Sequence, residues 1–478
     1  MENFFYRLDP ICTSDSEVQI DGESYAVQSK FARPKGVNKF VMKPANFKQI
    51  FKEENMKNNF KLETALVQSL EEFKEGEPRV YPLVQSTTYN YKDPDFVAGL
   101  FDLTESGHMY SRISNPTVQA FENKMALLEG GVGAVAVSSG MAATTMAITN
   151  ICNSGDHVVA LSTIYGGTFT LLSSSLKKLG IETTFFGPDS TEEEILSLVQ
   201  DNTKLIFGET IGNPGMNVLD FETISNAAKK AGLPFVVDNT IATPYLCRPI
   251  EHGANIVVHS TTKYIDGQAT CMGGVVIDAG NFKWDNGRFP DLVEPDPSYH
   301  GLSYYDTFKE LAYITKARTH ILRDYGAVLS PFNAFINLRG LETLHVRMDR
   351  HCENALKVAE FLEGHENVLW VNYPWLKSGK YFESAERYLP KGGSGMILFG
   401  IKGGAKAGRE FTKKLKFINN VVHLGDVRTC VLHPGSTTHR QLTDDEQIAA
   451  GVMPESIRLN VGIENIDDII NDIKSALE

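Results

Sequence analysis

Between residues 134 and 258, short apolar runs alternate with helical patterns, and this alternation constrains the fold more than any other feature. The runs have the length of β-strands: Ala134–Val137, His157–Leu161, Glu182–Phe186, Leu205–Gly208, Pro234–Val237 and Ile256–Val258. Helical patterns lie between them, around residues 141–152, 167–179, 192–200 and 221–231. Such alternation predicts an α/β fold with a mainly parallel sheet that helices cover on both faces.

The chain of 478 residues is long enough for several domain-sized units. Residues 119–326 contain the alternating pattern and are predicted to form the large domain. Residues 327–478 are predicted to form a smaller α+β domain, which begins with an amphipathic helix around His345 to Leu362. The preceding segments are residues 62–118, which carry a helical pattern only at their end, and an N-terminal extension of residues 1–61.

The N-terminal extension is basic and aromatic in its second half. From Lys30 to Lys61 it contains nine Lys and Arg residues, two glutamates and five phenylalanines. Aromatic residues among basic ones can bind single-stranded nucleic acid. An arm that packs on its own protein or on a partner subunit is the favoured interpretation. We therefore expect residues 1–55 to be dispensable for the chemistry of the protein.

Charge and cysteine content exclude several classes of protein. The net charge of −13 and the pI of about 5.5 argue against general binding to nucleic acid or to an anionic membrane. No apolar run is long enough to cross a bilayer, and the N-terminal residues lack the basic-then-apolar pattern of a secretory signal, so a cytoplasmic location is expected. The six cysteines include no CxxC pair, which predicts reduced thiols and neither a disulfide framework nor a metal site.

Polar residues follow several of the predicted strands. Because ligands of parallel sheets bind beyond the carboxyl ends of the strands, these residues are candidates for one site. The small residues of Ser138–Ala143 open a helix whose free N–H groups suit a phosphate. The other candidates are an aromatic ring, an amide, a carboxylate and a hydroxyl: Tyr165, Asn213, Asp238 and Thr240. A helix cap or a turn explains each of them singly.

Lys263 follows the last predicted strand, directly after Ser260, Thr261 and Thr262. A lysine at the end of a strand is usually a solvated surface residue. A buried amine whose pKa is lowered can instead form a Schiff base. Together with a phosphate cradle, a stacking ring and a buried carboxylate, such an amine matches the requirements of pyridoxal 5'-phosphate (PLP).

Longer motifs carry a family resemblance from about residue 62 to the end. Asp238–Pro244 and Ser260–Lys263 resemble the signature of the Cys/Met-metabolism family of PLP enzymes. Narrower motifs resemble the O-acetylhomoserine sulfhydrylases of that family: Tyr110–Pro116, Glu294–Gly301 and His433–His439. The resemblance implies the PLP-dependent transferase fold of type I, with a seven-stranded, mainly parallel sheet and a smaller C-terminal α+β domain.

The resemblance also implies roles for individual residues. Lys263 would hold PLP covalently and move protons, and Tyr165 would stack on the ring, so these two are the predicted catalytic residues. Asp238 would pair with the pyridine nitrogen. The remaining predicted cofactor contacts are Gly140, Met141, Ser260, Thr262, Thr240, Asn213 and, from a neighbouring subunit, Tyr110 and Arg112. The predicted substrate contacts are Arg458, Asn213 and His423, with Arg458 as a bidentate partner of the amino-acid carboxylate; a structural ion pair is the alternative for Arg458.

The implied reaction is γ-replacement on O-acetyl-L-homoserine, in which sulfide or a thiol such as methanethiol displaces acetate to give L-homocysteine or methionine. Methionine γ-lyase is the nearest alternative, but such lyases have a cysteine where this chain has Gly167, and lyases and synthases often have a serine where it has His423. The Glu294–Gly301 region disfavours a cystathionine γ-synthase. A non-catalytic PLP-fold protein is disfavoured because Lys263, Asp238 and Arg458 are all present. The family also implies a homo-oligomer, at least a dimer, with a tetramer by analogy.

Overall fold

The computed structural model describes residues 17–20, 23–26, 60–68, 75–438, 440, 443, 447–448 and 451–478. The chain divides into two compact units, Met1–Lys43 and Pro44–Glu478. In the first unit, β1 (Glu17–Ile20) and β2 (Glu23–Ala26) form an antiparallel pair. The expectations for the basic arm of residues 30–59 lie outside the described residues and stay predictions.

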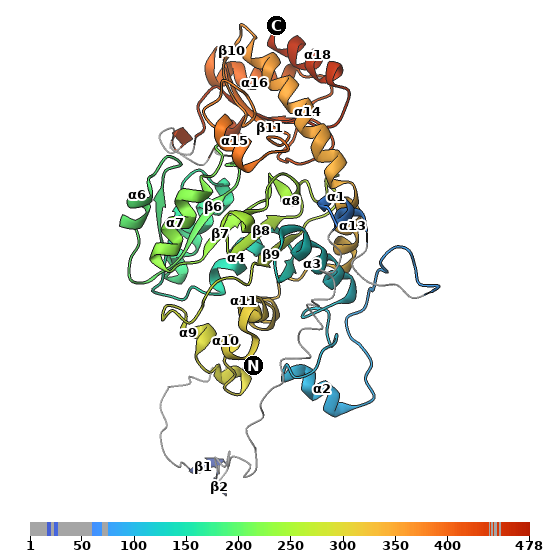
Figure 1. The fold of residues 1–478 in the computed structure, drawn as a ribbon, viewed down its shortest axis with the longest axis vertical. Coiled ribbons are helices and arrows are strands. Elements are labelled where there is room, and N and C mark those ends of the chain that lie inside the picture. Colours follow the sequence, from blue (N-terminus) through green and yellow to red (C-terminus); the bar gives the residue numbers. More distant parts are fainter. Residues whose placement is uncertain are drawn as a thin grey trace. The chain divides into compact units, whose positions relative to one another are not determined.

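A seven-stranded sheet forms the centre of the second unit (Figure 1). Its strand order is β3 (Gly133–Val137), β9 (Gly274–Asp278), β8 (Ile256–Ser260), β7 (Phe235–Asp238), β6 (Thr203–Glu209), β4 (His157–Leu161) and β5 (Glu182–Phe186). The six predicted strands all occur, and the mainly parallel α/β architecture is confirmed. The sequence pattern did not reveal β9, which pairs antiparallel with both β3 and β8.

Helices start where the sequence supplies capping side chains. The side chains of Asn115, Ser139 and Asp220 accept backbone N–H groups at the starts of α3 (Pro116–Glu129), α4 (Gly140–Thr149) and α7 (Phe221–Ala231). α4 packs against β8 and β9, whereas α7 packs against β6 and β7. The predicted helix of residues 167–179 is interrupted: α5 (Gly166–Thr170) continues as a π-helical turn, Leu171–Ser175, and a 3₁₀ turn, Lys177–Leu179.

The remaining helices of this part are short except for α13. Their bounds are α1 (Leu62–Val67), α2 (Pro94–Phe101), α6 (Glu192–Ser197), α8 (Thr243–Leu246), α9 (Pro290–Val293), α10 (Tyr304–Phe308), α11 (Ala312–Lys316), α12 (Arg323–Tyr325) and α13 (Pro331–Glu342). A π-helical turn, Ala317–Leu322, joins α11 to α12. α13 packs against α3 and against α14 (Leu344–Glu363), so it connects the large sheet to the C-terminal part.

The C-terminal part contains a second sheet of five strands. Its order is β10 (Val368–Asn372), β11 (Met396–Ile401), β14 (Ser456–Asn460), β13 (Cys430–Leu432) and β12 (Asn419–Asn420). Only the β12–β13 pair is parallel. The predicted amphipathic helix is α14, which contacts β10, β11 and α18 (Ile466–Leu477) (Figure 1). The structure also describes α15 (Phe382–Tyr388) and α16 (Gly404–Lys414) in this part.

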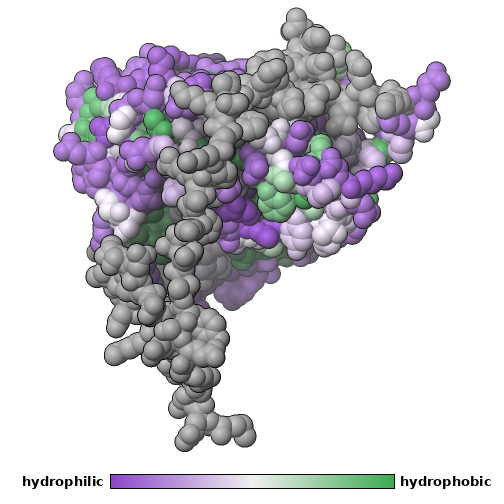
Figure 2. Space-filling view, turned by 90° about the horizontal axis from the view of Figure 1, so that it is seen from below, coloured by the Kyte–Doolittle hydropathy of each residue, from purple (hydrophilic) through white to green (hydrophobic). Residues whose placement is uncertain are grey.

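The buried apolar side chains form two clusters, one for each of these sheets. The larger cluster includes the strands of the seven-stranded sheet, whereas the smaller one lies between α14, α18 and the five-stranded sheet. On the face shown in Figure 2, hydrophilic side chains surround small and separate hydrophobic areas. Among the described residues, no helix combines the length and apolar character that a membrane crossing requires.

Candidate active site

Lys263 lies in the loop that connects β8 to the antiparallel strand β9. Thr262 closes the base of this loop, because its hydroxyl accepts the Gly273 N–H at 3.1 Å. Further along, the Asp266 carboxylate accepts the Thr270 N–H at 2.8 Å. Burial and the nearby charge of Arg458 lower the pKa of the Lys263 amine to about 8. The loop therefore presents an amine that exchanges protons close to neutral pH.

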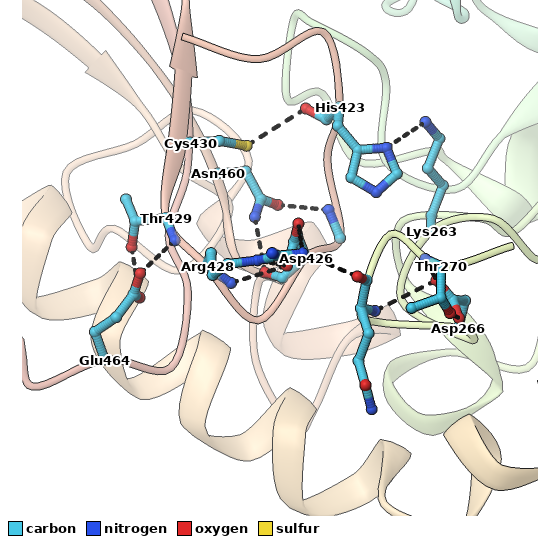
Figure 3. Close-up of polar contacts among 12 residues, drawn as sticks. Lys263, Asp266, Thr270, His423, Asp426, Arg428, Thr429, Cys430, Asn460 and Glu464 are labelled. Atoms are coloured by element: carbon cyan, nitrogen blue, oxygen red, sulfur yellow. Dashed lines mark hydrogen bonds and ion pairs between the residues drawn. The ribbon is translucent and has the colours of Figure 1, made fainter. Parts of the chain in front are cut away.

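His423 contacts this amine from the C-terminal part of the chain. Its Nδ1 lies 3.4 Å from Nζ of Lys263 (Figure 3). Burial and the charge of Lys263 lower the pKa of the imidazole to about 4, so His423 is neutral at physiological pH. The predicted contact of His423 with the substrate stays a prediction, and its contact with Lys263 was not expected from the sequence.

Asp238 ends β7, which is the neighbour of β6 in the sheet. Its Oδ1 accepts the Thr240 N–H at 3.0 Å and the Thr240 hydroxyl at 2.6 Å. Burial raises the pKa of this carboxyl group, and no Lys or Arg side chain of the described residues forms an ion pair with it. A carboxylate that has only neutral donors fits the N–H of a protonated ring nitrogen, which would lower its pKa again.

The start of α4 forms a cradle beside the end of β8. Ser139 takes the Ala142 N–H through its hydroxyl, whereas the first N–H groups of the helix, at Gly140 and Met141, have no partner within it. A Cβ atom at Gly140 would lie only 2.5 Å from Cβ of Ser260. Only glycine therefore allows the helix start and the Ser260 hydroxyl to meet, an arrangement that fits a phosphate group.

Tyr165 precedes α5 and is 45% exposed. Its backbone N–H donates to Oε2 of Glu209 at 2.6 Å. Glu209 ends β6 and is buried, and burial together with the neighbouring Asp238 raises the pKa of its carboxyl group well above the usual value. Glu209 was not among the predicted site residues, although a glutamate at the end of an apolar strand was an available signal. Glu209 fixes the backbone from which the Tyr165 ring projects.

Arg458 lies in β14 and is buried. Its Nη1 donates to Oδ1 of Asn213 at 3.3 Å, and its Nη2 donates to the backbone carbonyl of His423 at 3.0 Å. In the described part of the chain, no carboxylate forms an ion pair with Arg458. The alternative that Arg458 serves in a structural ion pair therefore has no support among these residues. A buried guanidinium with neutral acceptors is suited to the carboxylate of a ligand.

The described contacts of Tyr110 and Arg112 do not involve this cluster. Nη1 of Arg112 donates to the backbone carbonyl of Arg323, and its guanidinium carbon lies 5.3 Å from the centre of the Tyr110 ring. Tyr110 is 42% exposed. Within one chain, the structure thus joins Lys263 with the other predicted contacts on the sheet edge and in β14, but not with these two.

The composition of the site suits an organic cofactor. It offers an amine, a carboxylate, a phosphate cradle and a ring, whereas no group of three His, Cys, Asp or Glu side chains in the described residues could hold a metal ion. The cradle at Gly140 and the carboxylate of Asp238, which has no ion pair with a Lys or Arg side chain of the described residues, match the two ends of PLP.

Comparisons with known proteins agree with this geometry. The family described as "Cys/Met metabolism PLP-dependent enzyme" matches residues 63–478. O-acetyl-L-homoserine sulfhydrylase of Leptospira meyeri is 46% identical over 438 residues, which cover 89% of this chain and 98% of the relative. Homocysteine synthase of Schizosaccharomyces pombe is 46% identical over 403 residues, 84% of this chain and 94% of the relative.

A solved structure is also similar. It is that of a putative O-acetylhomoserine (thiol)-lyase of Campylobacter jejuni, with a pyridoxyl-lysine monophosphate, and it is 39% identical with a TM-score of 0.85. The match covers 87% of this chain and 100% of that structure. Both the large sheet and the C-terminal part are therefore shared with these proteins.

Proposed function

Because the chain belongs to the Cys/Met metabolism PLP-dependent enzyme family, we propose that it transfers the aminocarboxypropyl group of O-acetyl-L-homoserine to sulfide or a thiol. Acetate leaves, and the product is L-homocysteine with sulfide or methionine with methanethiol. The observation that carries the proposal is the 46% identity to an O-acetyl-L-homoserine sulfhydrylase over nearly all of both chains. The site supports it, because amine, carboxylate and buried guanidinium lie where an amino-acid substrate needs them.

Different residues of the chain have different roles in this reaction. When bound, PLP supplies a ring that takes up electrons from the α-carbon of the substrate. Asp238 would hold the proton on the ring nitrogen, and the N–H groups of Gly140 and Met141 would hold the phosphate. Arg458 would orient the substrate carboxylate. Nζ of Lys263, with its pKa lowered to about 8, can accept a proton from carbon and return it near neutral pH.

Gly167 supports replacement over methionine γ-elimination. A Cβ atom at this position would lie 2.5 Å from Cε1 of Tyr165. A cysteine here would therefore displace the Tyr165 ring or change the turn that carries it. The place of the Tyr165 ring in this chain therefore requires glycine at position 167. A γ-lyase that has cysteine at this position would need a different placement of the ring or of the turn.

A steady-state comparison of two substrates tests the proposed function. With O-acetyl-L-homoserine and sulfide, we expect sulfide-dependent formation of homocysteine. With methionine alone, we expect α-ketobutyrate to form at least about a hundredfold more slowly, which corresponds to a difference of about 2.7 kcal/mol in activation free energy. Fast turnover of methionine without sulfide-dependent formation of homocysteine would assign the protein to the lyases. Activity with cysteine as the nucleophile would assign it to the cystathionine synthases.

We also propose that the protein is a homo-oligomer, at least a dimer and by family analogy a tetramer. The contacts of Tyr110 and Arg112 support this, because within one chain neither residue has a described contact with the phosphate cradle. In the proposed assembly they contact the phosphate held by the neighbouring subunit, so that each site needs two chains.

Mixed oligomers of two inactive variants test this arrangement. Lys263→Ala and Arg112→Ala each remove one component, so each variant alone is expected to have little activity. If Arg112 acts on the neighbouring site, a mixed dimer contains one intact site and one site with both defects. Co-expression is then expected to restore up to about half of the wild-type activity per mixed dimer. Equal activities of the mixture and the separate Arg112→Ala protein would contradict a shared site.

A cytoplasmic location is proposed as well. It is supported by the five described cysteines, which are all free thiols and of which four are buried. Burial raises the pKa of the Cys152, Cys247 and Cys352 thiols, so they are suited to packing rather than to disulfide exchange.

A further inference from the structure

His423 makes contacts on two sides, with the amine of Lys263 and with the residue that would bind the substrate carboxylate. Its ring reaches Nζ of Lys263, with Nδ1 at 3.4 Å (Figure 3). Its backbone carbonyl accepts Nη2 of Arg458 at 3.0 Å and the thiol of Cys430 at 3.6 Å. The main chain at His423 is therefore anchored on the five-stranded sheet, while its ring extends to the loop after β8.

The protonation states define the direction of the hydrogen bond. An ammonium group has no lone pair, so below its pKa of about 8 the Lys263 amine can only donate. The imidazole, with its pKa lowered to about 4, is neutral. Nδ1 therefore accepts from Nζ, and the ring proton of His423 resides on Nε2. Nε2 is buried and has no hydrogen-bond partner among the described residues.

The other charged groups near the ring are already engaged. The charged groups that act on His423 are Lys263, Asp426, Asp266 and Arg458. Asp426 pairs with Arg428 at 2.9 Å, and Asp266 accepts the N–H of Thr270 at 2.8 Å. Of the four, only Lys263 forms a hydrogen bond with the ring. The ring of His423 thus has a specific partner, which is the amine.

We propose that His423 is a positioning residue that holds the free amine of Lys263 through Nδ1 while the amine moves protons. The inference rests on the proposed function and deepens it. The contact is made to the amine that is not bound to the cofactor, and this amine can donate an N–H to Nδ1 both as the ammonium group and after it has lost a proton. One N–H bound to Nδ1 fixes the rotation of the amine, so its lone pair has a defined direction. Arg458 donates to the backbone carbonyl of His423, so this one residue contacts both the predicted carboxylate-binding side chain and the amine.

Three substitutions separate this role from packing. The asparagine side chain of His423→Asn would carry its carbonyl oxygen close to the place of Nδ1, so this variant keeps an acceptor for Lys263. His423→Gln moves the acceptor toward the place of Nε2, and His423→Leu removes it. All three keep the backbone carbonyl that Arg458 binds. Leucine and asparagine thus form a matched pair that tests the presence of the acceptor, and glutamine and asparagine form a pair that tests its position.

The expected result is a fall in kcat with a small change in KM. For His423→Leu and His423→Gln, kcat for O-acetyl-L-homoserine and sulfide is expected to fall about tenfold to a hundredfold, as for loss of one charge-assisted hydrogen bond. KM for O-acetyl-L-homoserine is expected to change less than about threefold. His423→Asn is expected to recover most of the lost kcat. A leucine variant with wild-type kcat, or one that loses only KM, would overturn the proposal.

Nitrogen NMR of the full-length protein gives a readout that does not depend on turnover. In ¹⁵N-histidine-labelled protein, with and without cofactor, the signal that is absent in His423→Asn belongs to His423. We expect Nδ1 without a proton and Nε2 with one in the cofactor-free form, and a shift of Nδ1 in Lys263→Ala. A proton on Nδ1, or no shift, would contradict the contact.

The kinetic and NMR measurements together show whether the proposed function fails or only the positioning role of His423. Should the wild-type protein lack sulfide-dependent activity while Nδ1 responds to Lys263, the proposed function fails and the pairing stands. Should the wild-type protein be active and His423→Leu equally so, the positioning role fails alone. Cofactor absorbance and thermal unfolding of each variant show whether the fold is intact, and the NMR result decides the matter if the leucine variant does not fold.

Discussion

Replacement of Lys263 by alanine is expected to abolish turnover of O-acetyl-L-homoserine with sulfide. The amine is the proton carrier of the site, and loss of a positioned acid–base group lowers rates by about a hundredfold to ten-thousandfold. Loss of the covalent link to the cofactor adds to this effect. The measurements are kcat with saturating substrates and the visible absorbance of the lysine-bound cofactor, which the variant should lack.

Lys124 offers a matched control for this experiment. Its pKa is also lowered to about 8 by burial, but its Nζ donates to the carbonyl of Gln68, outside the site. Lys124→Met is expected to change the free energy of unfolding and to leave kcat of the folded protein near the wild-type value. A Lys263→Ala protein with wild-type kcat would remove Lys263 from the mechanism.

The positions of these residues follow from the sequence to different extents. Lys263 and Asp238 could be predicted because each comes directly after an apolar strand, and parallel strands bring such residues to one edge. β9 could not, because its run of Gly274–Asp278 follows a glycine-rich loop and returns antiparallel without a crossover helix. The break in the predicted helix at 167–179 follows from the glycines at its start and the serines at residues 173–175, which favour helices weakly.

Contacts between distant parts of the chain were the hardest features to predict from the sequence. The pairing of Lys263 with His423 joins residues 160 positions apart, and it depends on how the five-stranded sheet packs against the large one. Periodicity and motifs describe each part separately. The position of Glu209 at the end of an apolar strand was a signal, but its contact with Tyr165 was not visible in the sequence, because the partner is a backbone N–H rather than a complementary side chain. Packing between elements, not local pattern, determines both contacts.

Asp238→Asn is expected to lower kcat on the order of a hundredfold, with a smaller loss of cofactor affinity. The carboxylate would hold the proton on the ring nitrogen through a charge-assisted hydrogen bond, worth about 3 kcal/mol at most, which corresponds to roughly a hundredfold in rate. Asparagine keeps the shape and can still accept the Thr240 N–H, but it carries no charge to retain the ring proton. The measurements are kcat and the dissociation constant for PLP.

Asp278→Asn is the matched control, because this carboxyl group is also buried but lies at the opposite edge of the sheet, where Asp278 pairs with the start of β8. Burial raises its pKa to about 7. A raised pKa means that the folded state binds the extra proton, so its contribution to stability is present at low pH and is lost as pH rises through about 7. Asparagine removes that loss and is expected to stabilise the protein above pH 7 with kcat unchanged. An equal fall of kcat in both variants would show that buried charge in the sheet, and not a partner on the cofactor, explains the effect at Asp238.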